Sequence, residues 1–300
     1  MELNGVINVY KEAGFTSHDV VAKLRGIFHQ KKIGHTGTLD PDAEGVLPIC
    51  LGKGTRLCDM LTDHDKVYEA VLRLGIVTDT QDMSGAVLEE KEVKVTEAEV
   101  EACIASFVGE QMQIPPMYSA IKVNGKKLYE LAREGIEIER KARKVEFFSI
   151  DVLEMSLPTV RIRVHCSKGA YIRTLCHDIG AKLGCGGCME KLLRTKVERF
   201  TLDGAKKLFE IQQLVEQGVV EEHIIPVDQM FDHLPKVVTD SYGDKLVHNG
   251  NPVPWAMLQN PQENIAEDMQ LRVYDSDGKF IGIFKKKHEK IFPVKMFATH

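Results

Sequence analysis

The sequence lacks several features that would mark particular classes of protein. No apolar run approaches the ~20 residues that a membrane span needs. The first residues, MELNGVINVYKEAG, do not show the basic region and apolar core of a signal peptide. We therefore expect a cytoplasmic protein with no membrane partner. Internal repeats and low-complexity tracts are also absent, and 300 residues are enough for one large domain and one small one.

A disulfide framework is not expected, because the seven cysteines are odd in number and scattered along the chain. The CGGC stretch, Cys185–Cys188, could form a zinc site with Cys176 and His177 upstream. Its spacing is poor for a standard site, no second CxxC is present, and no compact strand–CxxC–helix unit suggests a thioredoxin. We interpret it as a glycine turn with reduced thiols and expect no metal.

The net charge of −5 does not favour a nucleic-acid partner, but the charges are unevenly distributed. Residues 122–144 hold eight Lys/Arg and four acids, and residues 160–200 hold nine Lys/Arg and three acids. A polarised surface can bind a polyanion on one side despite a negative total. Charge alone would still leave solvated faces as the better interpretation. The phosphate-binding pattern GxxxxGK[ST] is missing.

Apolar periodicity predicts an α+β arrangement in the first three quarters of the chain. We expect a short strand at 6–10, and strands at 66–75 and 159–167, where the apolar residues alternate. We expect helices at 16–28, 96–107 and 171–184, the second with a capping box of Thr96 and Glu99 and the third stopped by Gly184. Residues 31–45 are predicted to form a loop.

Two further regions have their own character. Residues 114–135 mix prolines, basic residues and tyrosines, which indicates a turn, a hairpin at Asn124–Gly125 and then one helical segment. After residue 232, the stretches 234–254 and 271–287 are interpreted as short strands, with a hairpin turn at Asp277–Gly278. We therefore predict a second, small β domain.

One loop carries an unusual carboxylate. In GHTGTLDPDAEGVLPIC, Gly34 to Cys50, Asp40 precedes a proline and must be extended, while Gly34 and Gly37 permit tight turns. Such an Asp can act as a nucleophile, a base or a metal ligand, or can simply cap its own backbone in an Asp-Pro turn. The neighbouring acids Asp42 and Glu44 match no metal signature. The residues alone leave these alternatives open.

The loop resembles the signature of the TruB family of tRNA pseudouridine synthases, on Gly34–Pro41 with Ala43, Gly45, Leu47 and Pro48. Further stretches resemble other family motifs in the same order: KVYEA, GIVTDTQDMSG, PPMYSAIKVNGKKLYELAREG, CSKGAYIRTLCHDIG and LLRTKVERF. The similarity runs from about residue 4 to residue 230. Two departures are Leu193, where the family usually has arginine, and Glu198, near which it usually has glycine.

The resemblance implies a fold and a division into domains. It implies the pseudouridine synthase fold, with a mixed or antiparallel sheet flanked by helices, in residues 1–232. Residues 114–145 would be an RNA-binding insertion. Residues 233–300 are similar to the small PUA-type RNA-binding domain.

The resemblance also implies an activity: conversion of uridine 55 in the T loop of tRNA to pseudouridine, without a cofactor. Asp40 would be the essential carboxylate, Arg173 its ion-pair partner and Tyr68 the residue that stacks on the uracil. The target base must be flipped out of its loop. The residues expected to bind the RNA or shape its pocket are His35, Lys11, Tyr171, Leu192, Lys122, Lys126, Lys127 and Arg133.

Other functions are weighed against this one. The same fold could serve as a non-catalytic tRNA-binding and folding chaperone, although Asp40, Tyr68 and Arg173 are all intact. A glycosidase would need two paired acids, for which Asp42 or Glu44 could partner Asp40. The expected partner is tRNA, and the expected oligomeric state is a monomer.

Overall fold

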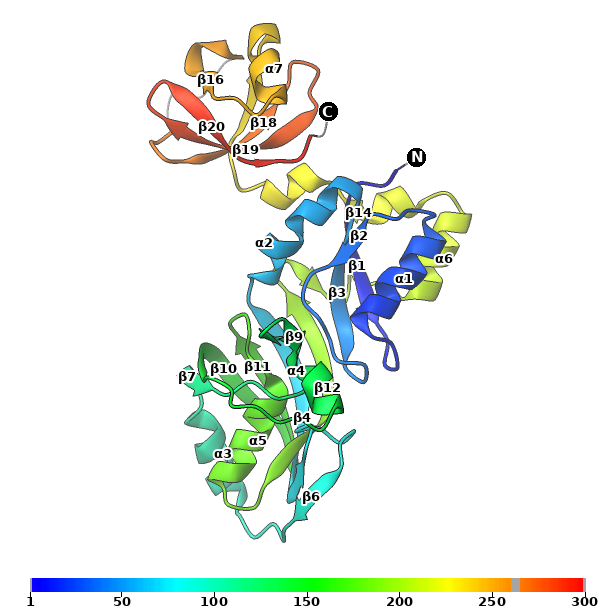
Figure 1. The fold of residues 1–300 in the computed structure, drawn as a ribbon, viewed down its shortest axis with the longest axis vertical. Coiled ribbons are helices and arrows are strands. Elements are labelled where there is room, and N and C mark those ends of the chain that lie inside the picture. The colour runs from blue at the N-terminus through cyan, green and yellow to red at the C-terminus, as the bar shows by residue number, and fades with distance from the viewer. Residues whose placement is uncertain (1, 260–264, 299–300) are drawn as a thin grey trace.

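The computed structural model describes residues 2–259 and 265–298. Met1, 260–264 and 299–300 belong to the predicted domains but lie outside the described residues. Figure 1 shows an elongated molecule, with the C-terminal sheet at one end and helices α3 and α5 towards the other. Among the described residues, no helix combines the length and the apolar character that crossing a membrane requires.

A ten-stranded mixed sheet forms the larger part, in the order β14-β1-β3-β12-β4-β11-β10-β7, with β13 paired to β12 and β2 to β3. Only β12 and β3 pair in parallel among these strands. Its strands are β1 (Gly5–Lys11), β2 (Ile33–His35), β3 (Glu44–Leu51), β4 (Lys66–Leu74), β7 (Gly109–Gln113), β10 (Arg143–Ser156), β11 (Thr159–Cys166), β12 (Gly187–Val197), β13 (Phe200–Thr201) and β14 (Ile224–Ile225).

Helices cover different parts of this sheet. The α-helices of the larger part are α1 (Ser17–Ile27), α2 (Cys58–Thr62), α3 (Glu97–Ala105), α4 (Leu128–Arg133), α5 (Ile172–Lys182) and α6 (Leu208–Glu216). Helices α1 and α6 pack on β1 and β3 through one apolar cluster, and α3 and α5 pack on β4, β10 and β11 through another. The 3-10 helices η1 (Gly52–Leu57), η2 (Val220–His223) and η3 (Val227–Phe231) complete this part.

The expected periodic elements are confirmed. Strands β4 and β11 alternate buried and more exposed residues along their length. Thr96 caps α3 with the predicted capping box, and Gly184 follows α5 with φ of 77°. Thr16 caps α1 in the same way, with Asp19 as its partner.

Two small hairpins lie outside the large sheet. Strands β5 (Ile76–Thr78) and β6 (Val87–Glu90) form one, and β8 (Lys122–Val123) and β9 (Lys126–Lys127) form the other. The second turns at Asn124 and Gly125, both with positive φ, as the sequence predicts for a tight hairpin. The predicted loop 31–45 also contains a short strand, β2, because Ile33–His35 pairs with β3.

A six-stranded sheet forms the C-terminal part, in the order β16-β20-β19-β18-β15-β17. Its elements are β15 (Lys236–Thr239), α7 (Ser241–His248), β16 (Val253–Pro254), η4 (Trp255–Met257), β17 (Leu258–Gln259), β18 (Gln270–Tyr274), β19 (Phe280–Lys287) and β20 (Lys290–Met296). The turn at Asp277–Gly278 joins β18 to β19, as predicted. The sheet supports the expected small β domain, and we propose residue 232 as the boundary.

The interpretation of 234–254 as strands alone is wrong for Ser241–His248, which forms helix α7. The Asp240 side chain caps this helix by accepting hydrogen bonds from the backbone N–H groups of Tyr242 and Gly243. Gly243 packs closely against Thr239 and the Met257 carbonyl, so this glycine allows a close contact and does not mark a turn.

Glu198 has a left-handed backbone, with φ of 51°, in the turn between β12 and β13. Glycine adopts this conformation without the steric cost that a Cβ brings. This explains physically why a glycine suits that place. Leu193, the other departure, is partly buried and pairs with Glu44 and Glu69 across the sheet.

The C-terminal sheet shares an apolar cluster with the larger part. Phe297 is 2% exposed, and its ring centroid lies 5.7 Å from that of Phe231 and 5.6 Å from that of Phe280. The Arg56 guanidinium donates to the Met296 carbonyl at 2.7 Å across the same boundary. The two sheets are therefore packed together and not only tethered.

We predict that Phe297→Ala destabilises the C-terminal sheet by about 3–5 kcal/mol, because it leaves a cavity among the three phenylalanine rings. Trp255, the single tryptophan, lies in this part and reports its unfolding by fluorescence in urea. Val294→Ala is the matched control, since Val294 is 52% exposed. Equal urea midpoints for the two variants would contradict this role of Phe297.

Candidate active site

The Asp40 loop is anchored by the residues on either side of the carboxylate. Leu39 and Ala43 are buried in the same apolar cluster as Tyr68 and the residues of α5. The Ser17 hydroxyl at the start of α1 accepts from the Leu39 N–H at 2.9 Å. The core thus fixes the loop, while the Asp40 side chain stays 40% exposed.

Two buried cations hold the backbone of this loop. The Lys11 ammonium donates to the carbonyls of Pro41, at 2.9 Å, and of Ala43. Arg194, which is completely buried, donates to the carbonyls of Val46 and Gly37 at 2.7 and 3.1 Å. Burial lowers the pKa of Lys11 to about 8, and the nearby Asp40 charge opposes that change.

Arg173 pairs with Asp40. Its Nε lies 3.0 Å from Asp40 Oδ2, and its Nη2 lies 3.4 Å from Oδ1, so two atoms of the guanidinium face two carboxylate oxygens. The Arg173 side chain is 6% exposed. The partnership that the family resemblance implied is therefore present as a contact, although the two residues are far apart in the chain.

Arg173 has further partners on two other segments. It donates to the Thr80 carbonyl at 3.2 Å and to the Tyr118 carbonyl at 2.8 Å. Its Nη1 also lies 3.4 Å from Asp82 Oδ2. The arginine therefore joins α5 to the loop after β5 and to the segment before β8.

Burial raises the pKa of Asp40 above its ordinary value. The Arg173 charge opposes this rise, and the Asp82 charge adds to it. The net direction stays upward despite the adjacent arginine. The arginine offsets part of the cost of ionising Asp40 and orients its oxygens.

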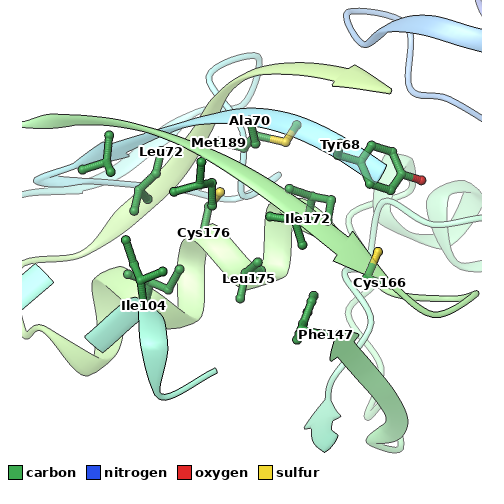
Figure 2. Packing of buried hydrophobic residues seen from close by; sticks show 14 of the residues in the cluster. Tyr68, Ala70, Leu72, Ile104, Phe147, Cys166, Ile172, Leu175, Cys176 and Met189 are labelled. Atoms are coloured by element: carbon green, nitrogen blue, oxygen red, sulfur yellow. The ribbon is translucent and has the colours of Figure 1, made fainter. Parts of the chain in front are cut away.

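Tyr68 lies on β4 opposite Arg194 in the sheet register and is 8% exposed. Figure 2 shows it at the end of the apolar cluster, with its hydroxyl pointing away from the other labelled side chains. Burial raises the pKa of Tyr68 to about 12, against the opposing charge of Arg194. The phenol is therefore neutral near pH 7.

His35 lies at the end of β2, and its ring packs edge-on against His18 at 5.2 Å between centroids. Burial lowers the pKa of His35 to about 4, so the ring is neutral near pH 7. Its Nδ1 is buried without a hydrogen-bond partner among the described residues. The ring can therefore fill space without bringing a charge.

Tyr171 and Leu192 are the two further residues that the resemblance places at the pocket. Tyr171 immediately precedes α5, and Gln113 bonds both its backbone N–H and its carbonyl, at 2.8 and 3.0 Å. Leu192 packs on the apolar cluster and pairs with Ala70 of β4. Packing in the core explains the position of Leu192 equally as well as a role in the substrate pocket would.

The four basic residues expected to bind RNA lie on the insertion. Lys126 pairs with Glu134 at 3.2 Å, and Lys127 donates to the Tyr129 hydroxyl at 3.1 Å. The Arg133 guanidinium lies 5.4 Å from the Tyr129 ring centroid, and Lys122 is exposed on β8. Lys126, Lys127 and Arg133 thus make these contacts inside the insertion.

The sequence did not identify Asp82 and Arg194 as site residues. Asp82 lies within the GIVTDTQDMSG stretch, and its Oδ1 accepts from Thr80 and Ser84. Arg194 directly follows the departure at Leu193 on β12. Burial does not alternate along β12, so periodicity gave no signal that could have identified the buried Arg194.

The acidic loop and CGGC are the two places where the sequence raises metal binding. No group of three His, Cys, Asp or Glu in 2–259 and 265–298 is arranged to hold a metal ion. Cys185 and Cys188 are buried free thiols, and Cys188 Sγ lies 3.4 Å from Met83 Sδ.

Comparison with known proteins gives a consistent result. Residues 25–172 match the family "TruB family pseudouridylate synthase (N terminal domain)", and residues 173–232 match "tRNA pseudouridylate synthase B C-terminal domain". A Lachnoclostridium phytofermentans protein named tRNA pseudouridine synthase B is 54% identical, over 98% of this chain and 100% of the relative. One of that name from Clostridium tetani is 47% identical, over 99% and 100%.

Solved structures agree on the fold. A chain from "Crystal Structure of a Cbf5-Nop10-Gar1 Complex" superposes with a TM-score of 0.72 at 28% identity, covering 98% of this chain and 85% of that one. A chain from "Structure of H/ACA RNP bound to a substrate RNA containing 2'-deoxyuridine" gives the same TM-score at 26% identity, with the same coverage.

We predict that Arg173→Met raises the pKa of the Asp40 carboxyl further above its ordinary value, because burial then acts without the opposing charge. The measurement is an NMR pH titration of the protein labelled with 13C at the aspartate carboxyl, with Asp40→Asn used to assign the signal. When the pKa of a carboxyl is higher in the folded protein than in the unfolded chain, the free energy of unfolding falls as the pH rises between these two pKa values. In Arg173→Met the upper of the two values is higher, so the free energy of unfolding continues to fall up to a higher pH.

Arg173→Lys is the control for this titration, since it keeps the positive charge at the same position. Its Asp40 pKa is expected to stay closer to that of the wild type. An Asp40 titration that is the same in all three proteins would show that Arg173 does not govern the ionisation of Asp40.

Proposed function

The chain belongs to the TruB family of pseudouridylate synthases, and we propose that it isomerises uridine 55 in the T loop of tRNA to pseudouridine. The observation that most directly supports this proposal is the contact of Asp40 with the buried Arg173, at 3.0 Å, in a chain of this family. We further propose that the enzyme acts as a monomer in the cytoplasm and needs no cofactor or metal.

The reaction breaks the N1–C1′ bond, turns the uracil and joins C5 to C1′. It neither oxidises nor reduces the substrate. C5 loses a proton to solvent and N1 gains one, so the composition of the nucleotide does not change. Asp40 either attacks the sugar or assists loss of the base, and in both cases it acts as the carboxylate. The contact with Arg173 supports this role, because it favours the ionised form and holds both oxygens in place.

Tyr68 is proposed to stack on the uracil and to help remove the C5 proton. Its position on β4, at the end of the apolar cluster, supports the stacking role. His35 is proposed to take up space near the extruded base, and a neutral ring suits that task. Lys11 would act on the loop, through its bonds to Pro41 and Ala43, and would not touch the substrate.

The insertion and the C-terminal domain are proposed to bind the rest of the tRNA. Exposed lysines and arginines contact phosphates without reading sequence, which suits a helical T arm whose major groove is inaccessible. The Lys285–Lys287 run on β19 would extend this basic path. The flipped base and the folded loop would then supply specificity.

We predict that Asp40→Asn binds tRNA with nearly the wild-type dissociation constant but turns it over roughly 10³-fold more slowly or worse, because the reaction loses its carboxylate. Tritium release from tRNA carrying 5-tritiated uridine measures turnover. Asp42→Asn is the matched control, since Asp42 is an exposed acid of the same loop and is expected to keep wild-type turnover.

Replacement of uridine 55 by cytidine should abolish release and so identify the site. Near-normal release from Asp40→Asn would exclude Asp40 as the essential group. Absence of release from the wild type, with tight tRNA binding retained, would instead favour a tRNA-folding chaperone.

We also predict that Lys126→Glu combined with Lys127→Glu weakens tRNA binding and reduces its salt dependence, by about one unit of slope for each phosphate that the variant no longer neutralises. Binding at several salt concentrations measures both effects. Lys91→Glu with Lys94→Glu reverses two lysines outside the insertion and is the control. If the dependence of the binding constant on salt has the same slope as in the control, Lys126 and Lys127 do not contact the RNA.

A further inference from the structure

Two cysteine side chains meet beside the start of the Asp40 loop. Cys50 lies on β3 and is fully buried, whereas Cys58 is the first residue of α2 and is partly exposed. The 3-10 helix η1 joins them along the chain. Both side chains pack in one apolar cluster with Leu57 and Leu61. Neither thiol has a part in the reaction proposed above.

Gly34 shows how close the two thiols are. In the sheet register Gly34 lies opposite Cys50, and the Cβ atoms of opposed residues are about 4.5–5.5 Å apart on the same face of a sheet. A Cβ added to Gly34 would lie 2.9 Å from Cys58 Sγ. The Cys58 thiol therefore occupies the space that a side chain at position 34 would fill, next to the side chain of Cys50.

This contact makes the two thiols chemically different. A hydrogen bond that the Cys50 thiol donates lowers the pKa of Cys58, and the charge of Lys295 acts in the same direction, while burial and Asp59 oppose the change. The same bond, together with burial, raises the pKa of Cys50. Cys58 is therefore the thiol of the pair that ionises first.

The other cysteines do not share these properties. All seven cysteines lie within the described part of the chain, and Cys58 is the one among them that is not buried. Burial raises the pKa of the remaining five, which are Cys103, Cys166, Cys176, Cys185 and Cys188. Oxidants act on an accessible thiolate, and redox-sensitive cysteines often lie next to a second cysteine. Cys58, with Cys50 beside it, meets both conditions.

We propose that Cys58 and Cys50 form a redox-sensitive site, which hydrogen peroxide converts into a reversible disulfide. The Cys58 thiolate attacks one peroxide oxygen and the O–O bond breaks, which gives a sulfenic acid on Cys58 and a hydroxide that takes up a proton. Cys50 then attacks the Cys58 sulfur, so that the S–S bond forms and the S–O bond breaks. The leaving hydroxyl departs as water with the Cys50 proton. The two sulfurs lose two electrons and the peroxide gains them, so two thiols and one peroxide give one disulfide and two waters.

The place of the pair in the fold indicates what a disulfide would connect. It would join β3 to α2 beside Gly34, where the Asp40 loop begins. After α2 the chain continues into β4, and Lys66 Nζ at the start of β4 donates to the Thr62 and His64 carbonyls at 3.0 and 2.6 Å. The pair thus lies between the segments that carry Asp40 and Tyr68. In reducing compartments, disulfides in such positions are usually transient and redox-sensing.

The test maps the disulfides of the full chain by mass spectrometry. Reduced protein is treated with a small excess of hydrogen peroxide and quenched in acid, and its remaining thiols are blocked with N-ethylmaleimide in denaturant. Trypsin cleaves after Lys53 and Arg56, so Cys50 and Cys58 fall on separate peptides, 33–53 and 57–66. We expect these two peptides to be linked before any other pair, and dithiothreitol to separate them. Cys58 should lose its free thiol at least ~10-fold faster than Cys103.

Three variants assign the two roles. Cys50→Ala should accumulate a sulfenic acid on Cys58 that dimedone traps, because the second thiol is missing. Cys58→Ser should leave Cys50 unmodified under the same treatment. Cys103→Ser is the matched control and should form the link at the wild-type rate. The Cys103 thiol donates to the Ile179 carbonyl at 3.8 Å, a bond that a serine hydroxyl can keep.

Two results would overturn the proposal. One is that Cys58 reacts no faster than Cys103 in the wild type. The other is that Cys58 is oxidised while peptides 33–53 and 57–66 stay unlinked, since Cys50 would then not act as the second thiol. Both results are obtained on the wild type, so they do not require that any variant folds. Neither uses tRNA or turnover, so the proposal stands or falls separately from the proposed isomerisation.

Discussion

The ionic contact between Arg173 and Asp40 is the interaction on which the site depends. A guanidinium that is only 6% exposed remains charged and stable only when its donors are satisfied. Here the acceptors come from the Asp40 loop, the Thr80–Asp82 loop and Tyr118 of the insertion. Segments distant in sequence therefore meet at one side chain. The same requirement that keeps Arg173 bonded also sets the position of the carboxylate.

The rest of the large sheet keeps that carboxylate still. Leu39 and Ala43 pack into the core on both sides of Asp40, so the loop cannot shift without exposing apolar surface. Lys11 and Arg194 bond to backbone carbonyls of the same loop, so their charges reach the site although their side chains are occupied. A carboxylate fixed in this way needs little reorganisation when a substrate arrives.

The sequence predicted those parts that depend on local pattern. Alternation identified β4 and β11, and the capping box identified α3, because these signals arise within a few residues. It missed helix α7, since Gly243 and its polar neighbours are also typical of a turn. It could not assign Asp82 or Arg194, whose partners lie on other strands and loops. The contact of Arg173 with Asp40 was expected only through the family resemblance, because spacing carries no information across 133 positions.

The proposed catalytic residues and the proposed RNA-binding residues lie in parts of the chain that are packed differently. Tyr68 belongs to the large sheet and its core, and Asp40 lies on a loop that Leu39 and Ala43 anchor in that core. The basic residues of the insertion instead pair with Glu134 and Tyr129 near the surface. Exposed pairs of this kind contribute little to folding, so they can be exchanged for phosphate contacts at small cost. The Tyr118 carbonyl, however, links the insertion to Arg173. A change in the insertion on binding RNA can thus be transmitted to the partner of Asp40 through one hydrogen bond.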